Sequence, residues 1–236
     1  MTRSPVVVHD LGSGTGSMMR WLAPLLPGPQ TWVLHDWNHA LLDHAAQRAS
    51  DSTGHPATVH TSVRDVGHLR DSDLAGASLV AMSALLDVLT REETETIVRA
   101  CVAAGAPALF TLTVTGRVDL EPFDPGDRVF ESAFNDHQRR TTAGRRLLGP
   151  DAVATAVDLF RAAGWSVRVD GSPWRLDASE PRLVGEWLEG WIAASVDERP
   201  ALEEWADEYL QTRRAQLIDG ALRIVVHHQD LLAWPS

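Results

Sequence analysis

An acidic residue followed by three alternating glycines is the feature of the sequence that most suggests chemistry. Asp10 ends an apolar, β-branched run, and Gly12, Gly14 and Gly16 follow it before an apolar helical pattern begins. Glycine at a strand-to-helix turn permits a tight bend and lets a ligand approach the backbone closely. A carboxylate in this place repels a pyrophosphate and attracts an ammonium group. The stretch therefore predicts a zwitterionic ligand, and a plain tight turn is the alternative.

The glycine spacing differs from that of a dinucleotide-binding turn. That fingerprint requires G-x-G-x-x-G, whereas the third glycine here comes one residue early and Ser17 stands in its place. Together with Asp10, this spacing disfavours a nicotinamide cofactor.

A second acidic residue follows at the distance expected for a ribose contact. Asp36 ends the second predicted strand, 20 residues after Gly16. An ionised carboxylate offers two acceptor oxygens, which suit a pair of ribose hydroxyls. The alternative is a helix N-cap, and the two roles can coexist.

The opening segment resembles the first motif of the class I S-adenosylmethionine-dependent methyltransferases. The family pattern D-x-G-x-G-x-G is matched by Asp10-Leu-Gly12-Ser13-Gly14-Thr-Gly16. The resemblance implies that S-adenosylmethionine is the cofactor. It also implies that this loop, Ser13 included, holds the methionine end, with Asp10 near the ammonium group.

Later motifs extend the same resemblance. It implies that Trp37 lies near the adenine or ribose, that Asp65 reads the adenine amino group, and that the Val66 backbone N–H reads a ring nitrogen. Ser83, at the carboxyl end of the fourth predicted strand, is placed beside the cofactor. Simple packing is the alternative for Trp37, and turn chemistry is the alternative for Asp65.

The order of the elements predicts an α/β fold. Apolar runs alternate with helical patterns, as in a parallel sheet covered by helices. We expect strands near residues 5–10, 31–36, 57–61, 78–83, 107–114 and 165–170, and another within 221–234. We expect helices near residues 16–26, 38–49, 91–104 and 150–163, and two more within 180–218. The resemblance implies a Rossmann-like, seven-stranded, mostly parallel sheet in the order 3-2-1-4-5-7-6, with helices on both faces and the last strand antiparallel.

Two segments interrupt this alternation and are interpreted as insertions. They are residues 116–148, after the fifth strand, and residues 180–218, after the sixth. Within a single domain spanning residues 1–236, they are expected to cover the acceptor site. The alternative is that they only complete the core.

Methyl transfer from a sulfonium is a direct displacement, so the protein mainly aligns the acceptor and no protein nucleophile is required. Asp87 and His137 are the candidates for a general base. Asp87 could equally cap a turn, and His137 could be an ordinary surface residue.

Four arginines suggest the charge of the acceptor. Arg139, Arg140, Arg145 and Arg146 fall within eight positions of an otherwise acidic chain. Guanidinium groups bind carboxylate or phosphate in pairs of hydrogen bonds. Arg139 and Arg140 are therefore predicted to bind an anionic acceptor, with a solvated charged face as the alternative. The run from His137 to Asp151 also resembles a feature of an actinobacterial-type subgroup of small-molecule methyltransferases.

Composition narrows the class of partner. The net charge of −11 disfavours nucleic acid, and no apolar stretch approaches the roughly 20 residues of a membrane span. The N-terminus has no secretory pattern, which predicts a cytoplasmic protein. Cys101 is expected to be a buried thiol, and no spacing of residues implies a metal.

The sequence therefore predicts a methyltransferase that acts on a small molecule. A non-catalytic or regulatory protein that binds the same cofactor stays open, as does, less favourably, an NAD(P)-dependent oxidoreductase. The oligomeric state is not predicted.

Overall fold

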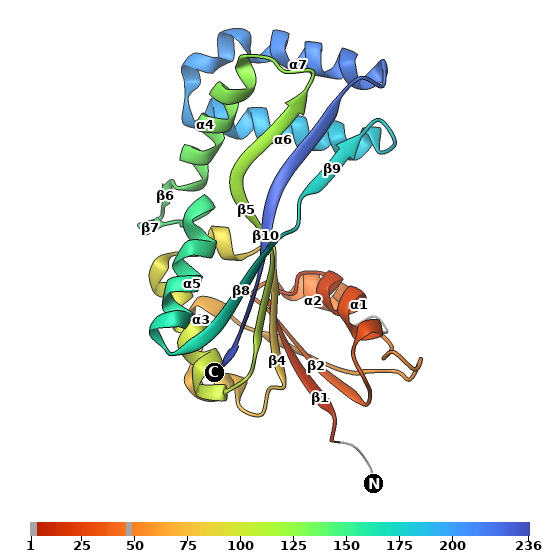
Figure 1. The fold of residues 1–236 in the computed structure, drawn as a ribbon, viewed down its shortest axis with the longest axis vertical. Coiled ribbons are helices and arrows are strands. Elements are labelled where there is room, and N and C mark those ends of the chain that lie inside the picture. Colours follow the sequence, from red (N-terminus) through yellow and green to blue (C-terminus); the bar gives the residue numbers. More distant parts are fainter. Residues whose placement is uncertain (1–3, 46–48) are drawn as a thin grey trace.

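A computed structural model describes residues 4–45 and 49–236 and contains one large mixed sheet (Figure 1). Its strands run in the order β3-β2-β1-β4-β5-β10-β8, and β9 also pairs with β10. The strands are β1 (Val6–Leu11), β2 (Gln30–Asp36), β3 (Thr58–Val63), β4 (Leu79–Ser83), β5 (Ala108–Glu121), β8 (Trp165–Gly171), β9 (Trp174–Asp177) and β10 (Arg223–Pro235). Since β8 and β10 are the sixth and seventh predicted strands, the predicted order is confirmed.

Strand directions also agree with the prediction. The first five strands pair in parallel, whereas β10 is antiparallel to β5, β8 and β9. Strand β9 was not predicted. It starts soon after β8 ends and continues the pairing along β10, with Gly171 opposite Gln229 and Trp174 opposite Val226.

The helices cover both faces of the sheet. They are α1 (Ser17–Leu22), α2 (His39–Ala45), α3 (Arg91–Ala104), α4 (Gly126–Gln138), α5 (Ala152–Ala162), α6 (Pro181–Glu198) and α7 (Glu203–Ile218). Helix α1 is shorter than expected because the chain passes into a 3₁₀ turn at Ala23–Leu25, which contains a proline. The last part of the helix predicted over 38–49 includes residues 46–48, which lie outside the described residues.

Two hydrophobic cores flank the lower half of the sheet. Helices α1 and α2 lie on one face and α3 and α5 on the other (Figure 1). Trp32 and Leu34 of β2 pack with Met19 of α1 in the first core, and Phe110 of β5 packs with Phe160 of α5 in the second. The carboxyl edge of the parallel strands is therefore held rigidly, which suits a binding site.

A third core lies beyond this edge, where β5 and β10 continue upward (Figure 1). Buried side chains of both strands, such as Val118 and Ile224, pack there with helices α4, α6 and α7. The prediction that the fifth strand ends near residue 114 was wrong, since β5 continues to Glu121. Val118 and Leu120 alternate with Arg117 and Asp119, and this period of two belongs to a strand with one buried face.

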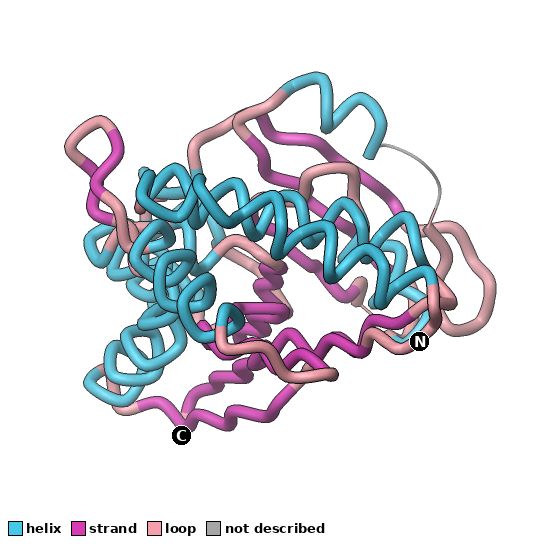
Figure 2. The backbone as a smooth tube through the Cα atoms, turned by 90° about the horizontal axis from the view of Figure 1, so that it is seen from above, coloured by secondary structure: helices cyan, strands magenta, loops and turns pink. Residues whose placement is uncertain are grey.

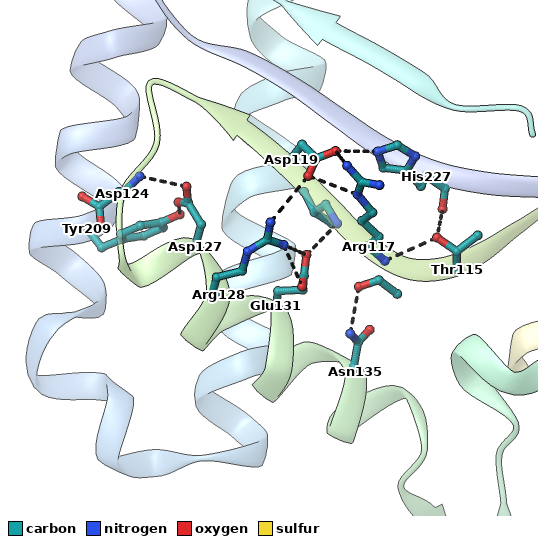
Figure 3. A network of polar contacts seen from close by, with 12 residues as sticks. Thr115, Arg117, Asp119, Asp124, Asp127, Arg128, Glu131, Asn135, Tyr209 and His227 are labelled. Atoms are coloured by element: carbon teal, nitrogen blue, oxygen red, sulfur yellow. Dashed lines mark hydrogen bonds and ion pairs between the residues drawn. The ribbon is translucent and has the colours of Figure 1, made fainter.

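Side chains of α4 cover the free edge of β5. The Val118 backbone N–H donates to Glu131 at 2.8 Å, and Asn135 Nδ2 donates to the Gly116 carbonyl at 2.8 Å. Figure 3 shows these contacts beside the pair of His227 and Asp119. An unpaired strand edge is thus satisfied within the chain.

A short hairpin follows α4. Strands β6 (Thr141–Thr142) and β7 (Arg145–Arg146) pair antiparallel across a turn of Ala143 and Gly144. Figure 2 shows the hairpin standing out from the body of the molecule.

Candidate active site

A cavity of about 540 Å³ opens at the carboxyl edge of the sheet. Its wall includes five residues that the sequence predicted for cofactor binding, namely Gly12, Asp36, Trp37, Asp65 and Val66. We call it the larger cavity. The remaining wall comes from the segment after β3, from the loop between β4 and α3, from the first turn of α3, and from the hairpin with its flanking residues: Arg64, His68, Leu85, Val88, Leu89, Glu93, Arg140, Thr142, Arg145 and Leu147.

Three glycines and Asp36 give the loop after β1 its shape. Gly12, Gly14 and Gly16 have φ angles of 64°, 52° and 78°, a region that favours glycine. The Gly14 N–H donates to Asp36 Oδ2 and the Asn38 N–H donates to Asp36 Oδ1, each at 2.8 Å. Asp36 therefore acts as a turn-forming residue, and each of its oxygens retains a lone pair for a hydroxyl at the cavity wall.

Asp10 lies buried beside this loop, although it does not line the cavity itself. Among residues 4–45 and 49–236, neither of its carboxylate oxygens has a hydrogen-bond partner, and the same is true of Ser13 Oγ. Burial, and secondarily the charge of Asp36, raises the pKa of Asp10 to about 7. An ammonium group would supply the missing partner, so the residues present fit the positive end of a zwitterionic ligand.

Gly12 also permits a close approach of the segment after β4. A Cβ at Gly12 would lie 2.5 Å from Leu85 Cδ2, so a larger residue would displace this side chain. The neighbouring Ala84 has a φ of 51°, which is unusual for a residue other than glycine. The segment Ser83–Leu85 is therefore held tightly against the glycine loop.

The residues predicted at the adenine end lie on the cavity wall. Trp37 is 76% exposed, so its ring is not part of the core. Asp65 Oδ1 accepts the Gly67 N–H at 2.9 Å, and Asp65 Oδ2 lies 3.0 Å from His68 Nδ1. Asp65 therefore stabilises the turn, as the alternative for this residue predicted, and it also lines the cavity.

A smaller cavity of about 300 Å³ lies on the other side of the segment after β4. Ser83, which was predicted to contact the cofactor, lines this smaller cavity, whereas Leu85 lines the larger one. The smaller cavity is lined by Ser17, Met18, Trp21, Ser83, Thr111, Leu112 and Asp230.

The two predicted general bases lie elsewhere. Asp87 is partly buried in the turn Leu86–Val88, where burial raises its pKa, and His137 lies on α4 with its Nδ1 3.4 Å from Asp197 Oδ2. Neither residue lines the larger or the smaller cavity. The structure therefore does not bring them to the glycine loop.

The four arginines separate into two pairs around the hairpin. Arg140 and Arg145 line the larger cavity, whereas Arg139 and Arg146 line a shallower hollow beside Asp151. Asp151 accepts two hydrogen bonds from Arg139, at 2.7 and 2.9 Å. Glu93 accepts two from Arg145, at 2.8 and 2.7 Å. The predicted single anion site is therefore not assembled, and Arg140 alone faces the larger cavity without a carboxylate partner among the described residues.

Several cavity residues escaped the sequence reading. Trp21 and Met18 belong to the apolar helical pattern after the glycine loop, and the sequence assigned neither of them a role. Asp230 follows His227, His228 and Gln229 in strand β10, and an acidic residue within a strand is the signal that could have identified it.

The comparisons with known proteins agree with this geometry. A family profile described as a methyltransferase domain matches residues 8–108, which include the glycine loop, Asp36 and the segment after β4. Residues 8–108 therefore form a methyltransferase domain, and the chain is an S-adenosylmethionine-dependent methyltransferase. No curated protein sequence matches it significantly.

Solved structures resemble the methyltransferase over nearly its whole length. A putative methyltransferase from Bacillus halodurans is 14% identical, with a TM-score of 0.54, and the match covers 99% of this chain and 94% of that one. The YcgJ protein of Bacillus subtilis is 12% identical, with a TM-score of 0.53 and the same coverage. A cyclopropane synthase of Mycobacterium tuberculosis, MmaA2, is 12% identical with a TM-score of 0.50, covering 97% of this chain and 78% of that one. At these identities, the likeness establishes the fold.

The family also gives the cofactor, which is S-adenosylmethionine. The predicted oxidoreductase alternative is therefore set aside. Within residues 4–45 and 49–236, no helix of the methyltransferase is long and apolar enough to cross a membrane.

Proposed function

We propose that the methyltransferase methylates a small-molecule acceptor that binds at the carboxyl edge of the sheet. The observation that carries this proposal is the pair of adjoining cavities on either side of Ser83–Leu85. The larger one is lined by five of the cofactor residues suggested by the motifs, and the smaller one has a separate set of wall residues. Volumes of about 300 and 540 Å³ suit small molecules.

The roles of the cofactor residues follow from their chemistry. When bound, S-adenosylmethionine supplies an electrophilic methyl group, which the acceptor takes by direct displacement. Asp10 in its ionised form would pair with the ammonium group, and Asp36 would accept hydrogen bonds from the ribose hydroxyls. Asp65, the Val66 N–H and the exposed ring of Trp37 would contact the adenine. Ser13 and Ser83, the latter on the wall of the smaller cavity, would lie beside the methionine end.

The protein's contribution to the reaction is alignment. The rigid glycine loop and the tightly held segment after β4 fix the relative positions of the two cavities. Fixed positions lower the entropic part of the barrier for a bimolecular displacement. This role requires no protein nucleophile.

The charge of the acceptor is a separate matter. Because Asp151 and Glu93 neutralise Arg139 and Arg145, an anionic acceptor is supported only by Arg140. If Arg140 holds an acceptor carboxylate, Arg140→Ala raises the Michaelis constant for the acceptor and leaves cofactor affinity unchanged.

Three broader parts of the proposal remain. The methyltransferase works as a single cytoplasmic domain. It has no nucleic-acid partner, and its net charge of −11 supports this part alone. The segments 116–148 and 180–218 cover the acceptor side. The hairpin of the first segment lines the larger cavity, so it supports a cover over the cofactor for that segment.

Calorimetry with S-adenosylhomocysteine tests the cofactor residues. Asp36→Asn removes the charge that would assist two hydrogen bonds to the ribose, so we expect binding to weaken by about 1.5–3 kcal/mol. Asp43→Asn is the matched control, because Asp43 lies exposed on α2 and pairs with His39. Equal affinity of the wild-type protein and Asp36→Asn would reduce Asp36 to a turn-forming residue.

A further inference from the structure

The charge on the wall of the smaller cavity is negative. Among the residues that the structure describes, Asp230 is the only charged one on this wall, and no arginine, lysine or histidine of that part of the chain lines it. The other wall residues are apolar or carry hydroxyl groups. This differs from the larger cavity, whose wall contains three arginines as well as three acidic residues.

The Asp230 carboxylate is anchored on one oxygen. Its Oδ1 accepts the Leu112 N–H at 2.9 Å and the Ser172 hydroxyl at 2.6 Å. Within residues 4–45 and 49–236, Asp230 forms no ion pair, and its Oδ2 accepts no hydrogen bond from the protein. The negative charge at the cavity is therefore fixed in place and not neutralised.

Unusual backbone conformations surround this carboxylate. Leu112, which lines the cavity, has a φ of 55°, and Ala84, next to Ser83 of the wall, has a φ of 51°. A hydrogen bond joins the end of β4 to β5 here, because the Ala84 N–H donates to the Thr111 carbonyl at 3.0 Å. Such conformations cost free energy and concentrate at ligand sites. Asp230 stabilises the unusual backbone conformation at Leu112, because it accepts the hydrogen bond from the Leu112 N–H.

The wall opposite the strands is suited to a cation. Trp21 of α1 is 59% exposed although it is a large apolar side chain, and Met18 of the same helix lies beside it on the wall. An indole face attracts an ammonium group, and the attraction adds to that of a carboxylate. Together these residues present an aromatic ring, a thioether and one carboxylate to the same small space.

We propose that the smaller cavity binds the methyl acceptor through a protonated amine, which is an anchor and not the methylated atom, with Asp230 as the counter-charge. The proposal names the substrate class for the methyl transfer described above and rests on it. An acceptor of this class carries an ammonium group next to an apolar part of modest size, as an arylalkylamine does.

Three matched probes test the charge preference. Benzylamine, benzyl alcohol and benzoate share a phenyl ring and differ in charge, and each is titrated by calorimetry or ligand-observed NMR in the presence of saturating S-adenosylhomocysteine. We expect benzylamine to bind at least tenfold more tightly than the other two. Asp230→Asn keeps an oxygen acceptor for Leu112 and Ser172, and it should lower benzylamine affinity to that of benzyl alcohol.

Asp170→Asn is the control variant. Asp170 lies opposite Asp230 in the pairing of β8 with β10 but does not line the cavity. The control should bind benzylamine as the wild-type protein does. A circular dichroism melt shows whether each variant folds.

Four outcomes would overturn the amine proposal. One is benzoate binding as tightly as benzylamine, which would favour the anionic acceptor and Arg140. Another is no benzylamine binding to the wild-type protein with S-adenosylhomocysteine bound, which would assign the smaller cavity to the cofactor. A third is unchanged benzylamine binding in Asp230→Asn. The fourth is an equal loss in Asp170→Asn, which would indicate a general effect of net charge. The binding of S-adenosylhomocysteine alone is measured first, so failure of the cofactor site is distinguished from failure of the amine site.

Discussion

At the scale of single residues, Asp10 connects binding to stability. Its carboxyl group is buried without a partner among the described residues, and its pKa is raised to about 7 from an ordinary value of 3.8. The folded protein therefore holds the proton more tightly than the unfolded chain does. The contribution of Asp10 to the free energy of unfolding should decrease as the pH rises from about 4 to about 7, because ionised Asp10 is costly to bury.

Asp10→Asn removes this ionisation. In the cofactor-free protein at pH 8, we expect the variant to be more stable than the wild type by up to about 4 kcal/mol, since one pKa unit corresponds to about 1.4 kcal/mol. Near pH 4 the difference should disappear. Urea unfolding at the two pH values measures it, and a variant that is less stable at both would contradict the assignment of a buried, unpaired charge.

Cofactor binding should show the opposite dependence. An ammonium group pairs with ionised Asp10, so wild-type affinity for S-adenosylhomocysteine should fall about tenfold for each pH unit below about 7. Asp10→Asn should bind more weakly at pH 8 and lose this dependence. Calorimetry between pH 5.5 and 8.5 checks both, and parallel pH profiles of the two proteins would exclude Asp10 from the cofactor contact.

The sequence was more informative about the loop than about the cavity walls. Asp10 and the glycines are adjacent in one motif, Asp36 ends the next strand, and the parallel pairing of β1 with β2 brings Gly12 and Asp36 to one wall. Trp21, Leu112 and Asp230 come from three distant segments, and only the pairing of β5 with β10 and the packing of α1 bring them together. His137 and Asp87 were selected by residue type, which carries no information on the direction of a side chain.

At the scale of elements, the β6–β7 hairpin is a part of the cofactor wall that an ion pair attaches to α3. Arg145 pairs with Glu93 of α3 through two hydrogen bonds and also donates to the Val88 carbonyl at 3.3 Å. Glu93 in turn accepts the Thr90 N–H at 2.8 Å, which completes a capping box at the start of α3. The hairpin is thus attached to a rigid helix terminus by one half-exposed arginine.

Arg145→Gln should loosen this attachment with little loss of global stability. A half-exposed ion pair contributes about 1 kcal/mol or less, so the melting temperature should change little. The dissociation rate of S-adenosylhomocysteine should rise severalfold, as measured by stopped-flow displacement. Arg146→Gln, whose side chain lines the neighbouring hollow, is the control. Equal dissociation rates in both variants would separate the hairpin from cofactor retention.

At the scale of the whole molecule, two long strands join the upper core to the lower ones. Strand β5 and strand β10 each contribute buried residues to both, as Phe110 and Val118 do for β5. The upper core also contains an ion pair, because Arg213 donates to Asp127 where both side chains are almost fully buried. Tyr209 donates to the same carboxylate, and Arg213 also donates to the Pro122 carbonyl at 2.7 Å.

Arg213→Ala should therefore destabilise the protein strongly. Removing one member of a buried pair leaves an uncompensated charge and costs about 3–5 kcal/mol. Because β5 and β10 run through both halves, we expect one cooperative unfolding transition at a lower temperature in differential scanning calorimetry. Two separate transitions, with only one shifted, would show that the upper core unfolds by itself.

The alternation along β5 and β10 has a consequence for how the upper half of the molecule can change over evolutionary time. In the upper half of these strands, one set of side chains faces the helices and the other faces away: Val118, Leu120, Ile224 and Val226 in the first set, and Arg117, Asp119, Val225 and His227 in the second. Substitutions in the second set leave the packed set untouched. Insertion or deletion of one residue within a strand would turn the side chains that follow it to the opposite face of the sheet. Divergence among relatives should therefore accumulate there as replacements at every second position, with strand length unchanged.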